Sequence, residues 1–182
     1  MIIYLDFDAS AGFPADAQAE IVRRVAGLFA RFNVTVQDTP PADMSAGKAL
    51  HVLIRGNDVV SQAGIGAAFQ PGNNQAFVRH LPTWSVYPAG VAAIIAHECG
   101  HAFGLRHLIE NGDYCHVLPN GDCPIMGTPA DAERAVWATG TNELGEPQDD
   151  VAMLTQALGL KGLEMTITVT GMKPVTVQLE PA

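Results

Sequence analysis

Hydrophobic residues alternate or recur at regular spacings along most of the chain, and the spacing changes several times. Alternating apolar positions predict strands at residues 2–7 and 50–55. Apolar residues three or four positions apart predict one amphipathic helix that begins near Pro14 and another over residues 88–103. Gly104 is placed to end the second helix in a left-handed turn. The first half therefore mixes strands and helices.

Shorter patterns complete the predicted sheet. Residues 34–37 and 75–79 are further strand candidates. The AAF of the glycine-rich run at residues 64–72 is expected to form a short edge strand, with residues 75–79 paired beside it across the PGNN turn. The sheet is thus expected in the first half of the chain.

The second half has fewer regular patterns. Residues 108–146 have the composition of a loop. Asp149 and Asp150 precede a final helix, where carboxylates meet the positive end of the helix dipole. Within residues 161–182, the segment MTITVTGMKPVTVQLE alternates strictly and turns at Gly171, which predicts a terminal β-hairpin. The fold class is therefore α+β.

Length and composition favour a single-domain protein and disfavour nucleic acid and membranes as partners. With 182 residues, 48% of them hydrophobic, the chain is long enough for one substantial core, so we expect a monomer with one main domain. Ten Lys and Arg against 19 Asp and Glu give a net charge of -9, which disfavours nucleic acid and anionic membrane surfaces as partners. No apolar run approaches the roughly 20 residues that span a bilayer.

The sequence begins with MIIYLDFD, so a predicted strand starts at its first residues. We therefore expect a leader or propeptide upstream and a secreted or periplasmic protein, with a cytoplasmic location as the alternative.

The stretch HECGHAFGLRH carries the candidate chemistry. His97 and His101 are four residues apart, so on a helix their imidazoles lie on one face and can bind one ion. A glycine turn at Gly104 reverses the chain and returns His107 to the same point. Three imidazoles with a fourth position left for water are typical of catalytic zinc. The spacing predicts a zinc site.

Glu98 is expected to have a different role. It is rotated by about 100° around the helix from His97, so it reaches the zinc-bound water instead of the metal. A carboxylate there can take the proton of that water as it attacks a carbonyl and return it to a leaving amine. These roles describe the hydrolysis of an amide.

The remaining histidines and the cysteines have simpler interpretations. His51, His80 and His116 lack spaced partners and are interpreted as ordinary packed or surface residues. Cys115 and Cys123 are eight positions apart in a turn-rich stretch, where a disulfide is plausible. The alternatives are three free thiols, including Cys99, or a metal site formed by Cys115, His116 and Cys123.

The pattern HExxHxxGxxH resembles the zinc signature of the metzincin metallopeptidases, and every fixed position matches. The resemblance implies a metzincin-like catalytic domain over residues 1–160, a twisted mixed sheet with an active-site helix and a C-terminal helix, followed by a hairpin extension at residues 161–182. It also implies that Met126, in CPIMGTP, forms a hydrophobic floor beneath the imidazoles. Asp149 and Asp150 are then helix caps or buried partners of this methionine turn.

Within the metzincins the order of elements is most similar to matrixins and their bacterial relatives. In such enzymes a peptide lies antiparallel to an edge strand, which implies substrate binding by Gly66, Ala67, Ala68 and Phe69. The loop at residues 108–128 is expected to shape the pocket. Leu108 departs from the residue that marks each subfamily, and no tyrosine lies two positions after Met126.

These observations predict a zinc-dependent endopeptidase that acts on proteins or peptides, with Glu98 activating the zinc-bound water. Two alternatives stay open. One is a zinc-containing protein-binding module without turnover, although a purely structural site has no use for Glu98. The other is a zinc amidohydrolase or aminopeptidase for small amides. Structural calcium is a further expectation from the resemblance, without assigned residues.

Overall fold

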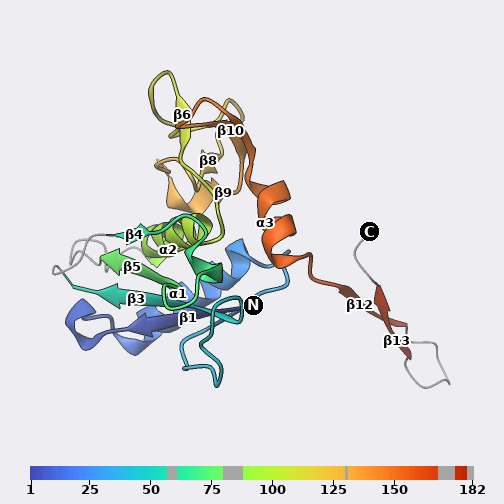
Figure 1. The fold of residues 1–182 in the computed structure, drawn as a ribbon. Helices are drawn as coiled ribbons and strands as arrows, with labels where there is room; N and C mark the ends of the chain where they lie inside the picture. The colour runs from blue at the N-terminus through green and yellow to red at the C-terminus, as the bar shows by residue number, and fades with distance from the viewer. Residues whose placement is uncertain (57–60, 80–87, 130, 168–174, 180–182) are drawn as a thin grey trace.

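The structure, a computed structural model, describes residues 1–182 except 57–60, 80–87, 130, 168–174 and 180–182 (Figure 1). The first half contains β1 (Ile2–Phe7), α1 (Ala15–Leu28), β2 (Thr35–Gln37), β3 (Ala49–Arg55), β4 (Gln62–Ala63), β5 (Gln75–Arg79) and α2 (Pro88–Ala102). The second half contains β6 (Leu108–Glu110), β7 (Asp113–Tyr114), β8 (Cys123–Pro124), β9 (Ala135–Val136), β10 (Thr139–Asn142), β11 (Pro147–Asp149), α3 (Asp150–Leu158), β12 (Leu163–Ile167) and β13 (Val175–Leu179).

A five-stranded sheet forms the body of the first half, in the order β2-β1-β3-β5-β4. Strands β1, β2, β3 and β5 are parallel, and β4 runs antiparallel to β5 at the edge. The register places Ile3 opposite Leu50 and Leu5 opposite Val52, and all four side chains are fully buried. They form one face of the sheet, which α1 and α2 cover. The predicted α+β class with a mixed sheet is confirmed.

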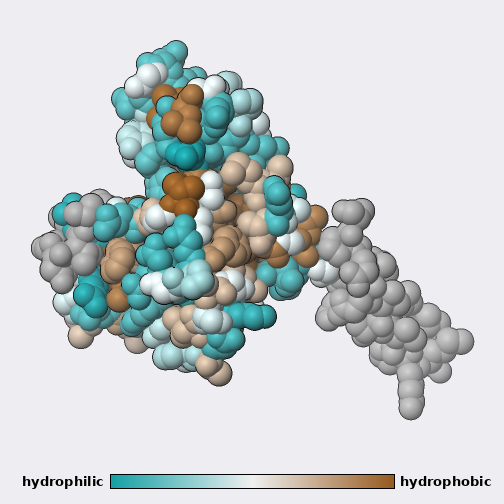
Figure 2. Space-filling model, in the orientation of Figure 1, coloured by the Kyte–Doolittle hydropathy of each residue, from teal (hydrophilic) through white to brown (hydrophobic). Residues whose placement is uncertain are grey.

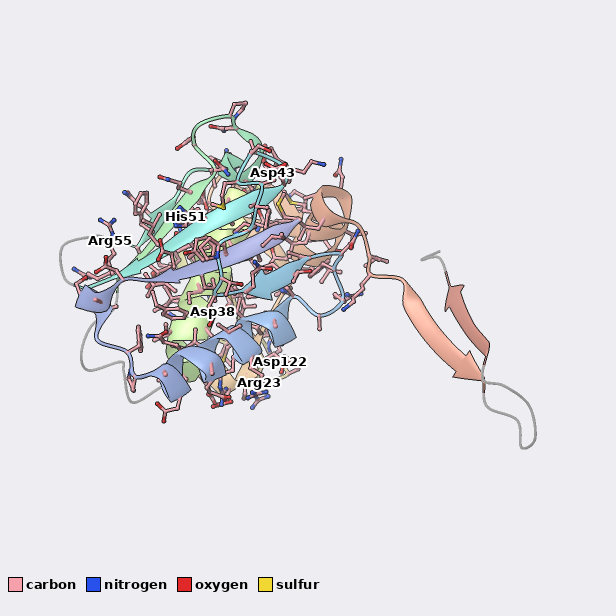
Figure 3. The ribbon with its side chains drawn as sticks, turned by 90° about the horizontal axis from the view of Figure 1, so that it is seen from below. Arg23, Asp38, Asp43, His51, Arg55 and Asp122 are labelled. Atoms are coloured by element: carbon pink, nitrogen blue, oxygen red, sulfur yellow. The ribbon has the colours of Figure 1, made fainter. Side chains whose placement is uncertain are left out.

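The opposite face of the sheet is partly exposed (Figure 3). On it, His51 of β3 stacks on Tyr4 with ring centroids 5.1 Å apart, and its Nε2 lies 2.8 Å from a carboxylate oxygen of Asp6. This histidine therefore has ordinary surface partners, as its sequence context indicates.

Aromatic contacts join the two halves of the molecule. Phe29, just after α1, packs against Phe103 and Trp137 at centroid distances of 6.0 and 5.2 Å. The indole nitrogen of Trp137 donates to the carbonyl of Leu28 at 2.8 Å. The second half is thus held to α1 by an aromatic cluster with a satisfied polar group.

Residues 108–146 are mostly loop, as their composition predicts, but the prediction missed the short strands among them. A four-stranded sheet in the order β11-β10-β6-β7 and a parallel pair of β8 with β9 lie in this region and the residues just after it. The strands are only two to four residues long. Segments this short do not repeat an apolar pattern often enough to be recognised by alternation.

The C-terminal elements follow the predicted order. Asp149 caps α3 by accepting a hydrogen bond from the amide of Ala152 at 2.9 Å. Strands β12 and β13 pair antiparallel with one another and project from the body (Figure 1). Gly171, the predicted turn, lies outside the described residues, and the boundary at residue 160 stays a prediction. Within the described chain, each helix is too short or too polar to cross a bilayer.

Candidate metal centre and catalytic site

The end of α2 has the geometry that the histidine spacing requires. Gly104 adopts a φ of 109°, and its amide donates to the carbonyl of His101 at 2.9 Å. The amide of Leu105 donates to the carbonyl of Gly100, also at 2.9 Å. This pair of bonds is a Schellman ending, in which glycine takes the left-handed position at little steric cost. The predicted turn at Gly104 is confirmed, and it directs the chain towards His107.

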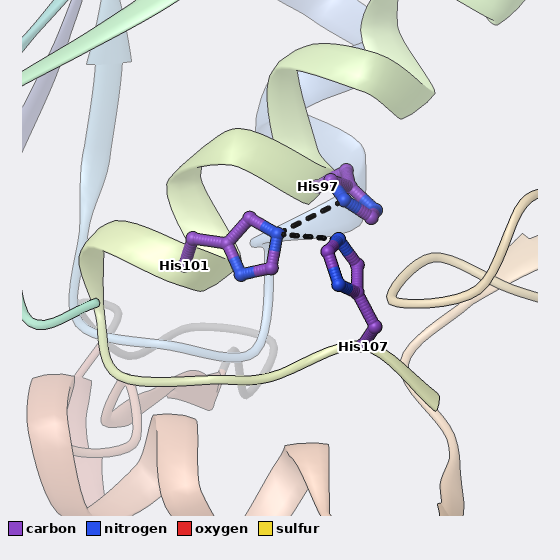
Figure 4. A group of neighbouring side chains, drawn as sticks. All are labelled: His97, His101 and His107. Carbon is purple, nitrogen blue, oxygen red and sulfur yellow. Dashed lines mark hydrogen bonds between the residues drawn. The ribbon is translucent and has the colours of Figure 1, made fainter. Parts of the chain in front are cut away.

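The structure brings the three histidines together (Figure 4). Nε2 of His101 lies 3.1 Å from Nε2 of His97 and 3.0 Å from Nε2 of His107. Two nitrogens bound to one tetrahedral zinc ion at about 2.0–2.1 Å lie about 3.3 Å apart. Within the described residues this is the one group of histidine, cysteine or carboxylate side chains close enough together to hold a metal.

The hydrogen bonds behind the rings determine which nitrogens face one another. Nδ1 of His97 lies 2.7 Å from the carbonyl oxygen of Ile125, and Nδ1 of His101 lies 2.9 Å from that of Leu105. A carbonyl can only accept, so both Nδ1 atoms carry protons and the Nε2 atoms of the neutral rings present lone pairs to each other. Facing lone pairs repel unless a cation lies between them. The donor set therefore fits zinc.

Burial favours the neutral form of these imidazoles. It lowers the pKa of His97 to about 4 and also lowers the pKa of His101. Burial raises the pKa of Glu98 to about 7, and its Oε2 atom has no hydrogen-bond partner among the described residues. A buried carboxylate oxygen without a partner is costly for the fold, which is the usual mark of a functional group.

Met126 packs against Gly100 of α2, the residue just before His101. It is fully buried, and a Cβ added to Gly100 of α2 would collide with its sulfur atom. The carbonyl of Met126 accepts the amide of Leu108 at 2.8 Å, so the methionine turn also holds the segment after His107. That Met126 forms a hydrophobic floor beneath the imidazoles stays a prediction.

His107 has partners of a different kind. Its Nδ1 lies 3.5 Å from a carboxylate oxygen of Glu143, and its ring meets that of Tyr114 edge to face at 4.9 Å. The amide of Glu143 donates to the carbonyl of His107 at 3.1 Å. The third histidine is therefore held by residues of the second half.

A cavity of about 430 Å³ adjoins the histidines. His97 and Glu98 lie on its wall, and the other lining residues are Ser61, Arg79, Gly90, Ala93, Ile94, Gly127, Thr128, Pro129 and Ala132. On the face shown in Figure 2, apolar residues gather where the two halves meet. The wall of this pocket is thus mostly apolar, as in many ligand-binding pockets, with the polar side chains of His97 and Glu98 on it.

The expected edge strand at the AAF stretch was wrong. Ala67–Phe69 form a short 3-10 helix, Ala67 and Ala68 are buried, and Gly66 is left-handed with a φ of 73°. The amide of Gly66 is already bonded to the carbonyl of His101 at 2.9 Å. The edge of the sheet is instead β4, at residues just before this turn. Glycines at residues 64 and 66 and the small alanines favour a tight turn over a strand.

The remaining histidines and the cysteines lie outside the histidine group. Nδ1 of His116 lies 2.9 Å from the carbonyl oxygen of Thr128, and His80 lies outside the described residues. All three cysteines are free and buried. The structure thus has the three-thiol alternative in place of the predicted bridge between Cys115 and Cys123.

Residues 22–108 match the model of the metallopeptidase family M12B, described as reprolysin-like. The match covers slightly less than half of the chain and includes all three histidines and Glu98. This match and the spacing of the three histidines support a metallopeptidase of the metzincin type. The predicted closeness to matrixins stays a prediction, because the matching model is the reprolysin-like one.

Several solved structures are similar to this chain at low identity. Metalloproteinase-II from Bacteroides fragilis has 15% identity and a TM-score of 0.49, over 87% of this chain and 53% of its own. A zinc-dependent peptidase from Methanocorpusculum labreanum has 15% identity and a TM-score of 0.45, over 74% and 93%. Myroilysin has 15% identity and a TM-score of 0.41, over 59% and 49%. The chain thus spans about half the length of myroilysin. No curated protein sequence matches it.

Sequence reasoning missed several residues around the site. Glu143, Tyr114 and Gln148 were not singled out, because the first two lie in the region interpreted as loop and Gln148 follows it directly. The stretch NELGE does contain a turn signal in Asn142 and Gly145, and Gly145 has a φ of 81°. That signal could have indicated the β10–β11 hairpin but not its contact with His107.

Proposed function

We propose that the chain is a zinc-dependent endopeptidase in which His97, His101 and His107 hold the metal. The observation that supports this most strongly is the convergence of three Nε2 atoms beside the unpartnered carboxylate oxygen of Glu98. His97 and Glu98 also line the same cavity. A site that only stabilises the fold has no need of that carboxylate, so catalysis explains the set better than structural binding.

Different residues are proposed to have different roles in the hydrolysis. When bound, zinc supplies Lewis-acid activation of the attacking water and of the scissile carbonyl. Glu98 acts as the general base that takes a proton from the water and afterwards as the general acid that delivers it to the leaving amine. His97 and His101 are oriented by the carbonyls of Ile125 and Leu105. Met126, which packs against the same helix, is proposed to lie beneath them.

The substrate is proposed to be a peptide in extended form. Strand β4 is an edge of the five-stranded sheet, and an edge strand offers free backbone groups to a peptide. The turn at Gly66, Ala67, Ala68 and Phe69 follows β4 and is proposed to flank the peptide, with the half-exposed Phe69 in contact with it. The apolar cavity then accepts one substrate side chain beside the reacting bond.

The test is a comparison of the purified protein with Glu98→Gln. The protein should contain one zinc per chain by elemental mass spectrometry and should cleave unfolded casein until a chelator is added. The substitution should keep the zinc but lower turnover by about 10²–10⁴-fold, the usual contribution of a general base. Undiminished cleavage by Glu98→Gln would refute the assignment of the base. Cleavage of a peptide with both ends blocked distinguishes an endopeptidase from an aminopeptidase.

Other expectations stay proposals of the same kind. The monomeric state and the secreted or periplasmic location rest on composition and on family resemblance. A structural calcium ion rests on the resemblance alone.

A further inference from the structure

The segment that carries His107 is held by a single buried amide side chain. The backbone amide of Arg106 donates to Oε1 of Gln148 at 3.0 Å, and Nε2 of Gln148 donates to the carbonyl of Arg106 at 2.7 Å. Gln148 is only 2% exposed. One side chain therefore satisfies both backbone groups of the residue just before His107, as a partner strand does in a sheet.

A hydrogen bond to Asp150 fixes the orientation of the Gln148 amide. Nε2 of Gln148 also donates to Oδ1 of Asp150 at 2.9 Å, and Oδ2 of Asp150 accepts the amide of Ala138 at 3.1 Å. Asp150 is fully buried. If the amide of Gln148 were flipped, its oxygen would face both the carboxylate and a carbonyl, and none of these can donate when Asp150 is ionised. The chain of bonds from Asp150 to Arg106 thus has one good arrangement.

Other residues of the β10–β11 hairpin also contact the segment that carries His107. Asn142 of β10 pairs with Leu108 of β6, and the amide of Glu143 donates to the carbonyl of His107 at 3.1 Å. Residues 106 and 107 are therefore hydrogen-bonded to the hairpin, and residue 108 lies opposite it in the sheet. The other two histidines, in contrast, lie on the rigid helix α2.

We propose that Gln148 is a positioning residue for the third metal ligand, which acts through the backbone of Arg106 to hold the His107 imidazole against those of His97 and His101. Without Gln148, both backbone groups of Arg106 lose their partner, so the peptide between Leu105 and His107 is less restrained, and ordering it opposes metal binding. Partners that orient metal ligands in this way typically contribute 10- to 100-fold in affinity. The inference rests on the proposed zinc site but not on peptide hydrolysis.

The test is zinc affinity, measured on the full chain by competition with a chromogenic chelator. Gln148→Met removes both bonds to Arg106 in a side chain of similar length. Gln148→Glu keeps the acceptor for the amide of Arg106 but turns the donor into a second acceptor. Glu146→Gln is the matched control, because Glu146 lies in the same hairpin with an exposed side chain. Both substitutions of Gln148 should weaken zinc binding by about 10- to 100-fold, and the control should match the wild type.

A fourth variant separates positioning from general stability. Val52→Ala removes a fully buried side chain from β3, remote from the hairpin, and should lower the melting temperature without changing zinc affinity by more than about twofold. The visible absorption of bound cobalt(II) should change in Gln148→Met and stay unchanged in Val52→Ala, because only the first alters the ligand geometry. Zinc affinity in the Gln148 variants equal to that of Glu146→Gln would overturn the inference.

An equal loss of affinity in Val52→Ala would also overturn it, since the effect would then follow stability alone. The experiments also distinguish failure of this inference from failure of the proposed peptidase function. A wild-type protein that binds zinc but cleaves no peptide refutes the peptidase and still tests Gln148. A wild-type protein that binds no zinc refutes both.

Discussion

Met126 packs its sulfur atom against Gly100, the residue of α2 just before His101. A Cβ at Gly100 would collide with that sulfur and lie 3.2 Å from Trp137 and 3.4 Å from Leu105. Alanine gains up to about 1 kcal/mol over glycine in a helix, but overpacking a core typically costs about 1–3 kcal/mol. We therefore expect Gly100→Ala to lower the free energy of unfolding by about 1–2 kcal/mol in urea titration.

The same helix provides a control. A Cβ at Gly90 meets no heavy atom of the described residues within 4 Å. Gly90→Ala should therefore raise the free energy of unfolding by up to about 1 kcal/mol through helix propensity. Equal stabilisation by both alanines would show that Met126 moves away without cost.

Asp150 should make stability depend on pH. Burial raises the pKa of its carboxyl from 3.8 to about 6 in the folded chain. Between about pH 4 and pH 6, Asp150 then binds a proton more tightly in the folded state than in the unfolded state, so its contribution to the free energy of unfolding falls as the pH rises and levels off above about pH 6. Each tenfold difference in proton affinity is about 1.4 kcal/mol, so the fall is on the order of 3 kcal/mol.

Asp150→Asn carries no titrating group at this position. Its unfolding free energy should lack this fall, although the asparagine loses one of the two acceptors that bond Gln148 and the amide of Ala138. Urea titrations from pH 4 to pH 7 in the presence of a chelator measure the difference without the pH dependence of metal binding. Parallel curves for the two proteins would contradict the assignment.

Glu143 should matter less for metal binding than Gln148. Its carboxylate lies 3.5 Å from Nδ1 of His107 and 3.4 Å from the guanidinium of Arg106, and its side chain is 32% exposed. Exposed pairs of this kind contribute about 0.2–1 kcal/mol and are screened by salt. We expect Glu143→Gln to weaken zinc binding by less than about fivefold, with a smaller effect in high salt. A loss of tenfold or more, independent of salt, would give Glu143 the larger role.

The cysteines should behave as three protected thiols. Cys99 and Cys123 are almost fully buried and Cys115 is 7% exposed, and burial raises the pKa of Cys99 and Cys115. Native protein without reductant should therefore react slowly with a thiol reagent, and unfolded protein should take up three labels. Uptake of a single label after unfolding would instead show a bridge between Cys115 and Cys123.

The sequence predicted those parts of the structure that depend on local patterns. The helix over residues 88–102 and the turn at Gly104 follow from apolar spacing and from one residue that tolerates a positive φ. The convergence of the three histidines follows from these two features. Strand β1 was predicted with its observed bounds because six residues suffice to show alternation.

Contacts between distant residues could not be predicted in this way. Gln148 reaches Arg106 across 42 positions, and no local pattern marks an amide as a backbone clamp. The local sequence around Ala67 and Ala68 fits an edge strand as well as it fits a turn. The hydrogen bond from the amide of Gly66 to the carbonyl of His101 accompanies the turn, and local sequence does not reveal this contact. The strands of the second half are too short to show a recognisable alternation of apolar residues. Their sheet is therefore visible only in the pairing of distant segments, which the local sequence does not reveal.

The three imidazoles come from both halves of the molecule. His97 and His101 extend from the helix packed on the large sheet, whereas His107 belongs to the segment bound by the hairpin of the smaller one. An ion held by all three is therefore also a cross-link between two bodies of unequal core size. Removing it should loosen the smaller body first, so that amides of residues 106–149 exchange with solvent, and become open to proteolysis, before those of the large sheet.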